Sequence, residues 1–120
     1  MTVSFTITGR PISKKNSKQL IRVGGRIVPI SSKAYLRFEK DALMQLLPYR
    51  KYRFNRTIKV EYHFYIQGKY HVDGDNLMAG INDILQKSGI ILDDDLIIEG
   101  CFKKYGGSAG WSTKISISDY

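Results

Sequence analysis

The pattern that most constrains the fold is a strict alternation from Ile58 to Ile66. Large apolar side chains occupy every second position, and polar or amphipathic side chains (Lys59, Glu61, His63, Tyr65) occupy the positions between. Successive side chains of a β-strand point to opposite faces, so this pattern predicts a long strand with one face buried. A strand of this kind needs a sheet around it and a second layer to cover its apolar face.

Several shorter segments also predict strands, because they alternate or are bounded by turn residues. They are Thr2–Thr8, the two arms of a hairpin within residues 19–30, Ile90–Leu92, Leu96–Lys104 and Thr113–Ser118. The hairpin is expected to turn at Gly24-Gly25, a pair that tolerates the positive φ of a tight turn.

Two segments predict helices. Ser31 or Ser32 can cap a helix that runs to Leu47, where Pro48 stops it. After a loop over residues 67–74, Leu77, Ile81, Ile84 and Leu85 share one helical face, and Ser88-Gly89 supplies the C-terminal cap. The order of the main elements is β-β-β-α-β-α-β-β. We therefore expect an α+β fold, a single domain over residues 1–120 with two main helices packed on a mixed sheet.

The positive charge lies mostly in the first half of the chain. The net charge is +8, but residues 1–59 carry 14 basic and 2 acidic residues, whereas residues 60–120 carry 5 basic and 9 acidic ones. Such an excess indicates a polyanionic partner, although it could serve solubility alone. The segment 13–18 is a cationic loop, and Lys33, Arg37 and Lys40 share one helical face that is either merely solvated or contacts phosphates. The candidate DNA-binding residues are Lys14, Lys15, Asn16, Lys18, Lys33, Arg37, Lys40 and Lys69.

Other features argue against export and membranes. A single cysteine, Cys101, excludes an internal disulfide and suits a reducing compartment; alone among apolar neighbours it is expected to be a packed hydrophobe. No apolar run reaches about 18 residues, and the N-terminal residues alternate where a signal peptide would be continuously apolar. We expect a soluble cytoplasmic protein with no membrane partner.

The acidic residues cluster. Six of the eleven lie between positions 73 and 95, namely Asp73, Asp75, Asp83, Asp93, Asp94 and Asp95. A divalent cation would relieve their mutual repulsion, and hard oxygen ligands suit Mg²⁺ or Mn²⁺. The alternatives are structural: Asp75 could be only a helix N-cap and Asp93–Asp95 only a solvated turn. An EF-hand is excluded, because its twelfth position would be Ile84. The distance between the Asp93–Asp95 turn and the start of the helix stays open.

Three motifs in order resemble the RusA family of Holliday-junction resolvases. They are Asp73-Gly-Asp75-Asn-Leu, then Asp83-Ile-Leu-Gln-Lys-Ser-Gly89, then Leu92-Asp-Asp94, with Pro11-Ile-Ser-Lys-Lys-Asn16 upstream similar to a family segment after the first strand. The resemblance implies an α+β homodimer that uses Mg²⁺ to make paired nicks across four-way DNA junctions in recombination and repair. It also implies that Asp73, Asp75 and Asp94 are catalytic and hold the metal. Asp93 is a supporting candidate, and Asp95 lies outside the pattern.

One position departs from the family. Members commonly carry a lysine four residues after the second aspartate, and this chain has Ala79 there. Lys69, Lys14 and Lys15 are the candidates to replace it. If none does, the chain could be a non-catalytic basic DNA-binding module; an RNA-binding role is a third, weaker hypothesis.

Overall fold

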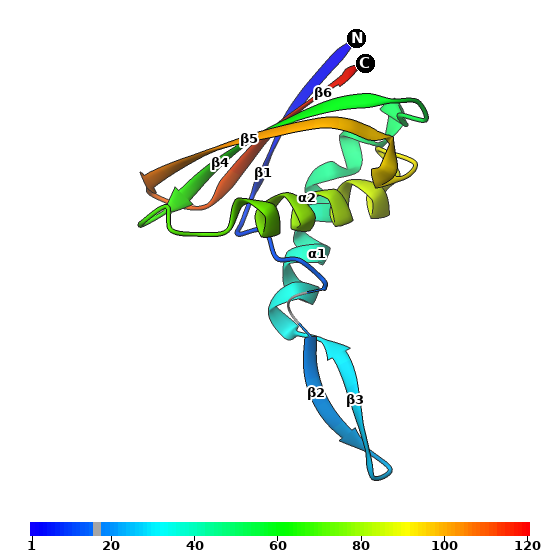
Figure 1. Ribbon diagram of the computed structural model, residues 1–120, viewed down its shortest axis with the longest axis vertical. Helices are drawn as coiled ribbons and strands as arrows, with labels where there is room; N and C mark the ends of the chain where they lie inside the picture. The colour runs from blue at the N-terminus through cyan, green and yellow to red at the C-terminus, as the bar shows by residue number, and fades with distance from the viewer. Residues whose placement is uncertain (16–17) are drawn as a thin grey trace.

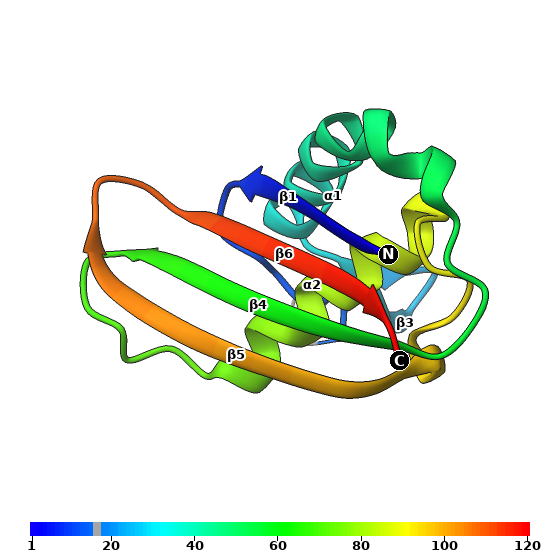
Figure 2. The ribbon, with the colours of Figure 1, turned by 90° about the horizontal axis from the view of Figure 1, so that it is seen from above.

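The central element is a four-stranded mixed sheet. The computed structural model describes residues 1–15 and 18–120, and the strand order is β1-β6-β4-β5. The strands are β1 (Thr2–Thr8), β4 (Ile58–Gln67), β5 (Ile97–Ser108) and β6 (Ser112–Asp119). β4 runs antiparallel to β6 and parallel to β5. The helices α1 (Lys33–Leu46) and α2 (Gly74–Ser88) lie on one face of this sheet, and the other face is open (Figures 1 and 2).

The alternation of β4 produces the core. Its apolar residues from Ile58 to Ile66 are buried, and the residues between them are only half-buried on the open face. Val3, Phe5 and Ile7 of β1 bury the same face, and Ile81, Ile84 and Leu85 of α2 pack into the same cluster. The α+β class, the mixed sheet and the element order predicted from the sequence are confirmed.

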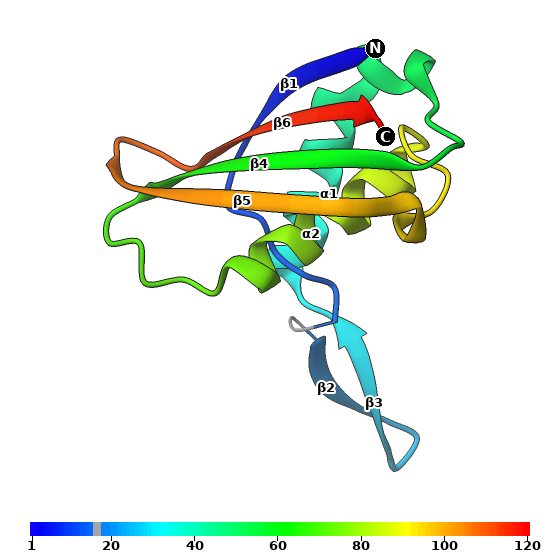
Figure 3. The same cartoon turned by 45° about the horizontal axis from the view of Figure 1, so that its top comes forward.

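A β-hairpin projects from this body (Figures 1 and 3). It consists of β2 (Lys18–Val23) and β3 (Arg26–Ser31), joined as predicted by Gly24 and Gly25, whose φ angles are +55° and +79°. None of its side chains is buried, and Leu20 and Ile27 remain 71% and 63% exposed. The hairpin is therefore an exposed projection that lies outside the hydrophobic core.

The first end of α1 is capped as the sequence predicted, and its other end continues into a short 3₁₀ helix. The Ser32 hydroxyl accepts a hydrogen bond from the Tyr35 backbone N–H at 3.1 Å and caps α1. The α-helix ends at Leu46, but the chain continues as a 3₁₀ helix, η1 (Leu47–Tyr52), because Pro48 is tolerated in a first helical turn. Within the described ranges no helix is long and apolar enough to cross a membrane.

Two predicted strands need correction. Ile90–Leu92 is not a strand, since Ile91 forms only an isolated bridge with Phe54. The Phe54 backbone holds this segment by accepting from the Leu92 N–H at 2.9 Å and donating to the Ile90 carbonyl at 2.7 Å. β5 extends beyond the predicted end at Lys104, because its pairing with β4 continues to Ser108.

Phe54→Ala is expected to lower the free energy of unfolding by about 3–5 kcal/mol, because the ring is fully buried and its removal leaves a cavity. Urea denaturation measures the change. Leu47→Ala is the control: that side chain is 56% exposed, so its loss should matter by less than about 0.5 kcal/mol. Similar effects for the two variants would contradict the assignment of Phe54 to the core.

Candidate active site

Asp73 and Asp75 lie at the start of α2. The N-cap is Asp73, not Asp75 as the sequence suggested: the Asp73 Oδ1 accepts from the Asp75 N–H at 2.9 Å. Asp75 lies in the first turn, and both residues are exposed. Gly74 between them is buried, and a Cβ there would overlap the ring of Phe102 on β5. Packing against β5 therefore fixes both carboxylates at the end of the helix where the dipole favours negative charge.

Asp94 is held at the opposite end of α2. It begins a short 3₁₀ helix, η2 (Asp94–Leu96), whose N-cap Asp93 accepts from the Asp95 N–H at 3.1 Å. The Gln86 Oε1 accepts from the Asp94 N–H at 3.0 Å. Gln86 lies in the last turns of α2, so this hydrogen bond ties the acidic turn to the C-terminal end of the helix.

The loop after β1 joins this end of α2. An added Cβ at Gly80 would lie 3.0 Å from the Ile12 backbone, so glycine lets the loop cross the helix closely. Beyond the crossing, the Lys14 N–H donates to the Asp83 Oδ2 at 3.3 Å. An open cavity of about 450 Å³ results, lined by Lys14, Tyr35, Asp83, Gln86, Lys87 and Asp94.

The acids in this region perturb one another. Partial desolvation, a hydrogen bond with Asp93 and the negative charges of Asp93, Asp83 and Asp95 raise the pKa of Asp94. The Asp95 backbone N–H lowers the pKa of Asp93. A carboxyl whose charged form is disfavoured by its neighbours has a stronger tendency to accept a proton or a cation. The structure thus brings Asp94 together with Asp83, which the sequence had not singled out as a site residue.

Two cations lie near the acids of this cavity. They are Lys14 and Lys87, which both line the cavity and both lower the pKa of Glu39 on α1. Burial alone would raise that pKa, but hydrogen bonds from Tyr35 and Lys87 and the positive charges of Lys87 and Lys14 outweigh the effect of burial. The Lys87 Nζ donates to the Glu39 Oε1 at 2.9 Å. Lys87 is therefore engaged with Glu39, whereas no ion pair of Lys14 is found among the described residues.

The three implied metal ligands do not meet within one chain. Asp75 and Gln86 are eleven positions apart on α2, which is roughly 16 Å along the axis. Mg²⁺ binds its oxygen ligands at roughly 2.1 Å. Within residues 1–15 and 18–120, no three His, Cys, Asp or Glu side chains come close enough to hold a metal ion. The oxygen chemistry of Asp73, Asp75 and Asp94 suits a hard cation, but within one copy of the chain Asp73 and Asp75 lie at one end of α2 and Asp94 lies at the other.

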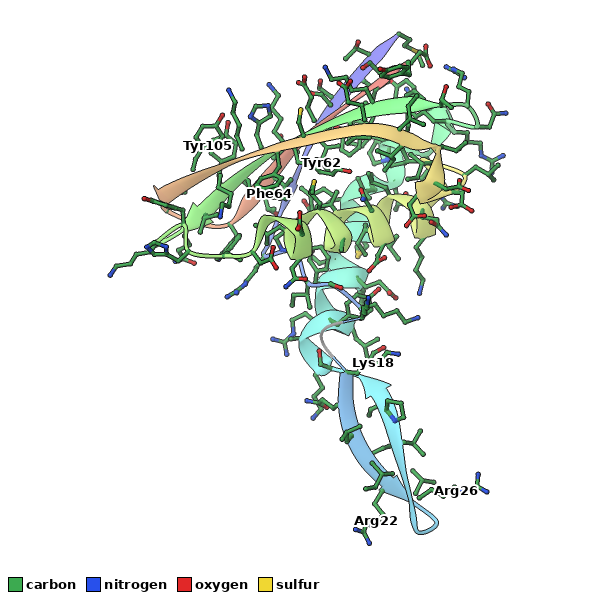
Figure 4. All side chains as sticks on the ribbon, viewed as in Figure 1. Lys18, Arg22, Arg26, Tyr62, Phe64 and Tyr105 are labelled. Carbon is green, nitrogen blue, oxygen red and sulfur yellow. The ribbon has the colours of Figure 1, made fainter. Side chains whose placement is uncertain are left out.

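The predicted basic residues are distributed over the hairpin, α1 and two loops. Lys15 is exposed beside Lys14, Lys69 is exposed after β4, and Ala79 is half-buried on α2; Asn16 lies outside the described residues. Lys33, Arg37 and Lys40 are exposed on α1, and Arg37 and Lys40 line an open cavity of about 570 Å³ together with Arg10. Lys18 lies at the base of the hairpin and Arg22 and Arg26 lie near its tip (Figure 4).

The structure adds residues that the sequence had not singled out as candidates for DNA binding or for positioning the aspartates. Arg10 could have been suggested by its place beside the cationic loop, and Arg22 and Arg26 by their places flanking the Gly-Gly turn. Nothing in the sequence signals that Gln86 orients Asp94. Cys101, expected to be packed, is exposed, because it faces the uncovered side of the edge strand β5.

A family model described as "Endodeoxyribonuclease RusA" matches residues 8–118, nearly the whole chain. A search of curated proteins gave no match. The matched region contains both ends of α2 with all the aspartates described above, together with the basic loop and α1. The chain therefore belongs to the RusA family of endodeoxyribonucleases.

Proposed function

We propose that this protein resolves four-way DNA junctions by paired, metal-dependent nicks, as a homodimer acting in recombination and repair in the cytoplasm. The observation that carries the proposal is the family match over residues 8–118, which includes every carboxylate of the candidate site. The catalytic residues are Asp73, Asp75 and Asp94, with Asp93 in support. Mg²⁺ is the proposed ion and Mn²⁺ the alternative, because carboxylate oxygens suit both.

The basic surface supports DNA as the substrate. Positive residues on the hairpin, the loop after β1 and α1 come from separate elements, so they can follow a phosphate backbone over some length. Contacts to phosphate and sugar position a protein without reading sequence, which suits an enzyme that recognises branched structure. A two-fold dimer would match the symmetry of a four-way junction and bring two sites to two strands.

The structure favours Lys14 as the replacement for the lysine absent at position 79. Lys14 lines the cavity that holds Asp94, and its backbone is fixed by Asp83. A cation placed there can stabilise charge that develops on the phosphate during cleavage. Neither Lys15 nor Lys69 is among the residues that line this cavity.

Lys14→Ala is expected to slow single-turnover nicking of a junction by about 100-fold, the effect of losing one preorganised stabiliser of roughly 3 kcal/mol. Lys15→Ala is the matched control and should remain close to wild type, as should Lys69→Ala. Ala79→Lys should change the rate little, because Lys14 already supplies the charge. A wild-type rate for Lys14→Ala would show that Lys14 does not assist the chemistry.

The function is tested by incubating the protein with a labelled four-way junction, a linear duplex of the same sequence and a single strand, with Mg²⁺ or with EDTA. We expect nicks only in the junction and only with Mg²⁺. Equal cutting of duplex and junction would contradict structure selectivity. Tight junction binding without cutting in Mg²⁺ or Mn²⁺ would instead identify a DNA-binding module that has lost catalysis, the alternative that Ala79 raises.

A further inference from the structure

Three aromatic side chains gather on the open face of the sheet. The Tyr105 ring of β5 stacks on the Tyr65 ring with centroids 4.9 Å apart, and on the His63 ring with centroids 5.9 Å apart. The His63 Nδ1 and the Tyr105 hydroxyl also share a hydrogen bond of 3.0 Å. Figure 4 shows Tyr105 on the side of the sheet away from α2, where it is 37% exposed. None of the three belongs to the hydrophobic core, so core packing does not explain why these rings gather here.

Two lysines flank this aromatic cluster of His63, Tyr65 and Tyr105. The strand register places Lys103 of β5 and Lys114 of β6 directly beside His63, one on either side. Both lysines are exposed, and neither forms an ion pair among the described residues. The acids that β4 and β5 carry on this face lie further along the strands, where both pair with Lys59, at 3.5 and 3.1 Å. The aromatic end of the open face is therefore positively charged.

A cavity of about 160 Å³ adjoins the aromatic cluster. Its lining includes Glu61, His63, Cys101 and Lys103, which form two adjacent cross-strand pairs of β4 and β5. Because His63 is one of its walls, a flat group in this cavity can stack on the imidazole ring and extend the existing stack of rings. The Lys103 ammonium lies at the same place, where it can meet a negative charge attached to that flat group.

We propose that this face binds single-stranded DNA, with bases stacked on the aromatic cluster and the backbone held by Lys103. Unpaired bases offer flat faces to aromatic rings, whereas the bases of a duplex already stack on each other. A four-stranded sheet with aromatic residues on one face and helices on the other can hold single strands in this way. DNA is the expected strand, because the chain belongs to a family of endodeoxyribonucleases. The inference goes beyond the proposed function, since such binding needs neither the aspartates nor a metal ion.

The aromatic cluster lies apart from the surface proposed for the junction arms. The helix α1 and the hairpin lie on the helical side of the sheet, and the aromatic cluster lies on the opposite side (Figures 1 and 4). One copy of the chain can therefore hold an unpaired strand on one face while duplex arms contact the other.

Fluorescence anisotropy in EDTA tests whether the bases contribute. The probes are a labelled oligothymidine of about 12 nucleotides and a strand of the same length whose nucleotides lack bases. The oligothymidine should bind at least about tenfold more tightly, because the two strands carry the same phosphates and differ only in the groups that can stack. Equal affinities would show binding through charge alone and would overturn the proposal.

Substitutions of Tyr105 locate the bases. Tyr105→Leu keeps an apolar side chain without the ring and should weaken oligothymidine binding by about tenfold, the effect expected of one lost stack. Tyr105→Phe keeps the ring and should bind nearly as tightly as the wild type. The matched control is Tyr120→Leu: Tyr120 is 68% exposed and lies eight positions beyond Ser112, the partner of Tyr65, which is roughly 27 Å along the strand. No loss for Tyr105→Leu, or an equal loss for Tyr120→Leu, would overturn the proposal.

The single cysteine reports directly on what covers this face. Cys101 is exposed and lines the cavity beside His63. With oligothymidine at about ten times its Kd, alkylation of Cys101 by a maleimide should slow about tenfold, because only about a tenth of the sites remain free. The control reporter is Thr2→Cys in a Cys101→Ser background, since Thr2 lies on the same face at the opposite corner of the sheet and should react equally with and without DNA. Unchanged alkylation of Cys101 would overturn the proposal.

The same reactions identify other occupants. Alkylation of Cys101 that slows as the protein concentration rises, without DNA, would show that a second copy covers this face and would overturn the proposal. An oligouridine that binds more tightly than the oligothymidine would overturn the assignment to DNA. Because none of these measurements uses a junction or a metal ion, their failure leaves the proposed function standing. Binding of oligothymidine by a protein that never nicks junctions would refute the proposed function and leave this surface standing.

Discussion

Asp75→Asn is expected to abolish nicking of a four-way junction, by at least about 1,000-fold in single-turnover rate, while junction binding stays intact or tightens. An amide removes one of the few negative oxygen ligands that the site can offer to a cation. It also removes a negative charge that repels the DNA phosphate. Asp75 is exposed in the first turn of α2, and among the described residues the helix is capped by the side chain of Asp73 rather than by that of Asp75, so the change should not disturb the helix.

Asp95→Asn is the control for this variant. Asp95 is an exposed acid of the same cluster, outside the family pattern, so its loss should leave the rate within a few-fold of wild type. Gel-shift affinities measured in Ca²⁺ or EDTA separate binding from cutting. Cutting by Asp75→Asn at a tenth of the wild-type rate would remove Asp75 from the catalytic set.

The affinity for junction DNA is expected to fall by about 1,000-fold between 50 and 200 mM salt, if about six phosphates are contacted. Each neutralised phosphate releases condensed counterions, and added salt opposes that release. The basic residues on the hairpin, on α1 and in the loop after β1 are the proposed contacts. A nearly flat salt dependence would contradict a DNA-facing role for these basic residues.

Single substitutions locate the contacts. Arg37→Ala and Lys40→Ala on α1 should each reduce the slope of log affinity against log salt by about 1. Lys114→Ala is the control, because β6 pairs Lys114 with His63 on the open face of the sheet, away from α1. An equal change of slope for Lys114→Ala would place the DNA on the other face.

Much of the fold follows from local pattern. The alternation of β4, the Gly24-Gly25 turn and the Ser32 cap each depend on neighbouring residues, and each prediction was confirmed. The prediction of a strand over Ile90–Leu92 was wrong, because Ile90 and Ile91 are buried in a segment that is held by the Phe54 backbone, and periodicity does not distinguish this from a sheet.

The site was harder to predict, because its geometry depends on distant segments. Asp73 and Asp75 are both plausible N-caps by sequence, and the packing of Phe102 against Gly74 is a tertiary contact. Likewise, the attachment of Asp94 to Gln86 and the approach of Lys14 to Asp83 join residues that no motif connects. The resemblance to the family identified the aspartates. The structure shows that Asp73 and Asp75 lie at the start of α2 and that Asp94 lies near its end. Their assignment as metal ligands stays a prediction.

The most direct test of the central claim uses a supercoiled plasmid that extrudes a cruciform, a four-way junction within a closed circle. Paired nicks across the junction convert the plasmid to linear DNA. A single nick instead releases the supercoiling, so the cruciform is reabsorbed and a nicked circle remains. We predict linear product with Mg²⁺, none with EDTA, and none from a plasmid without the inverted repeat. Nicked circles alone, or equal cutting of both plasmids, would contradict the account of this protein as a junction resolvase.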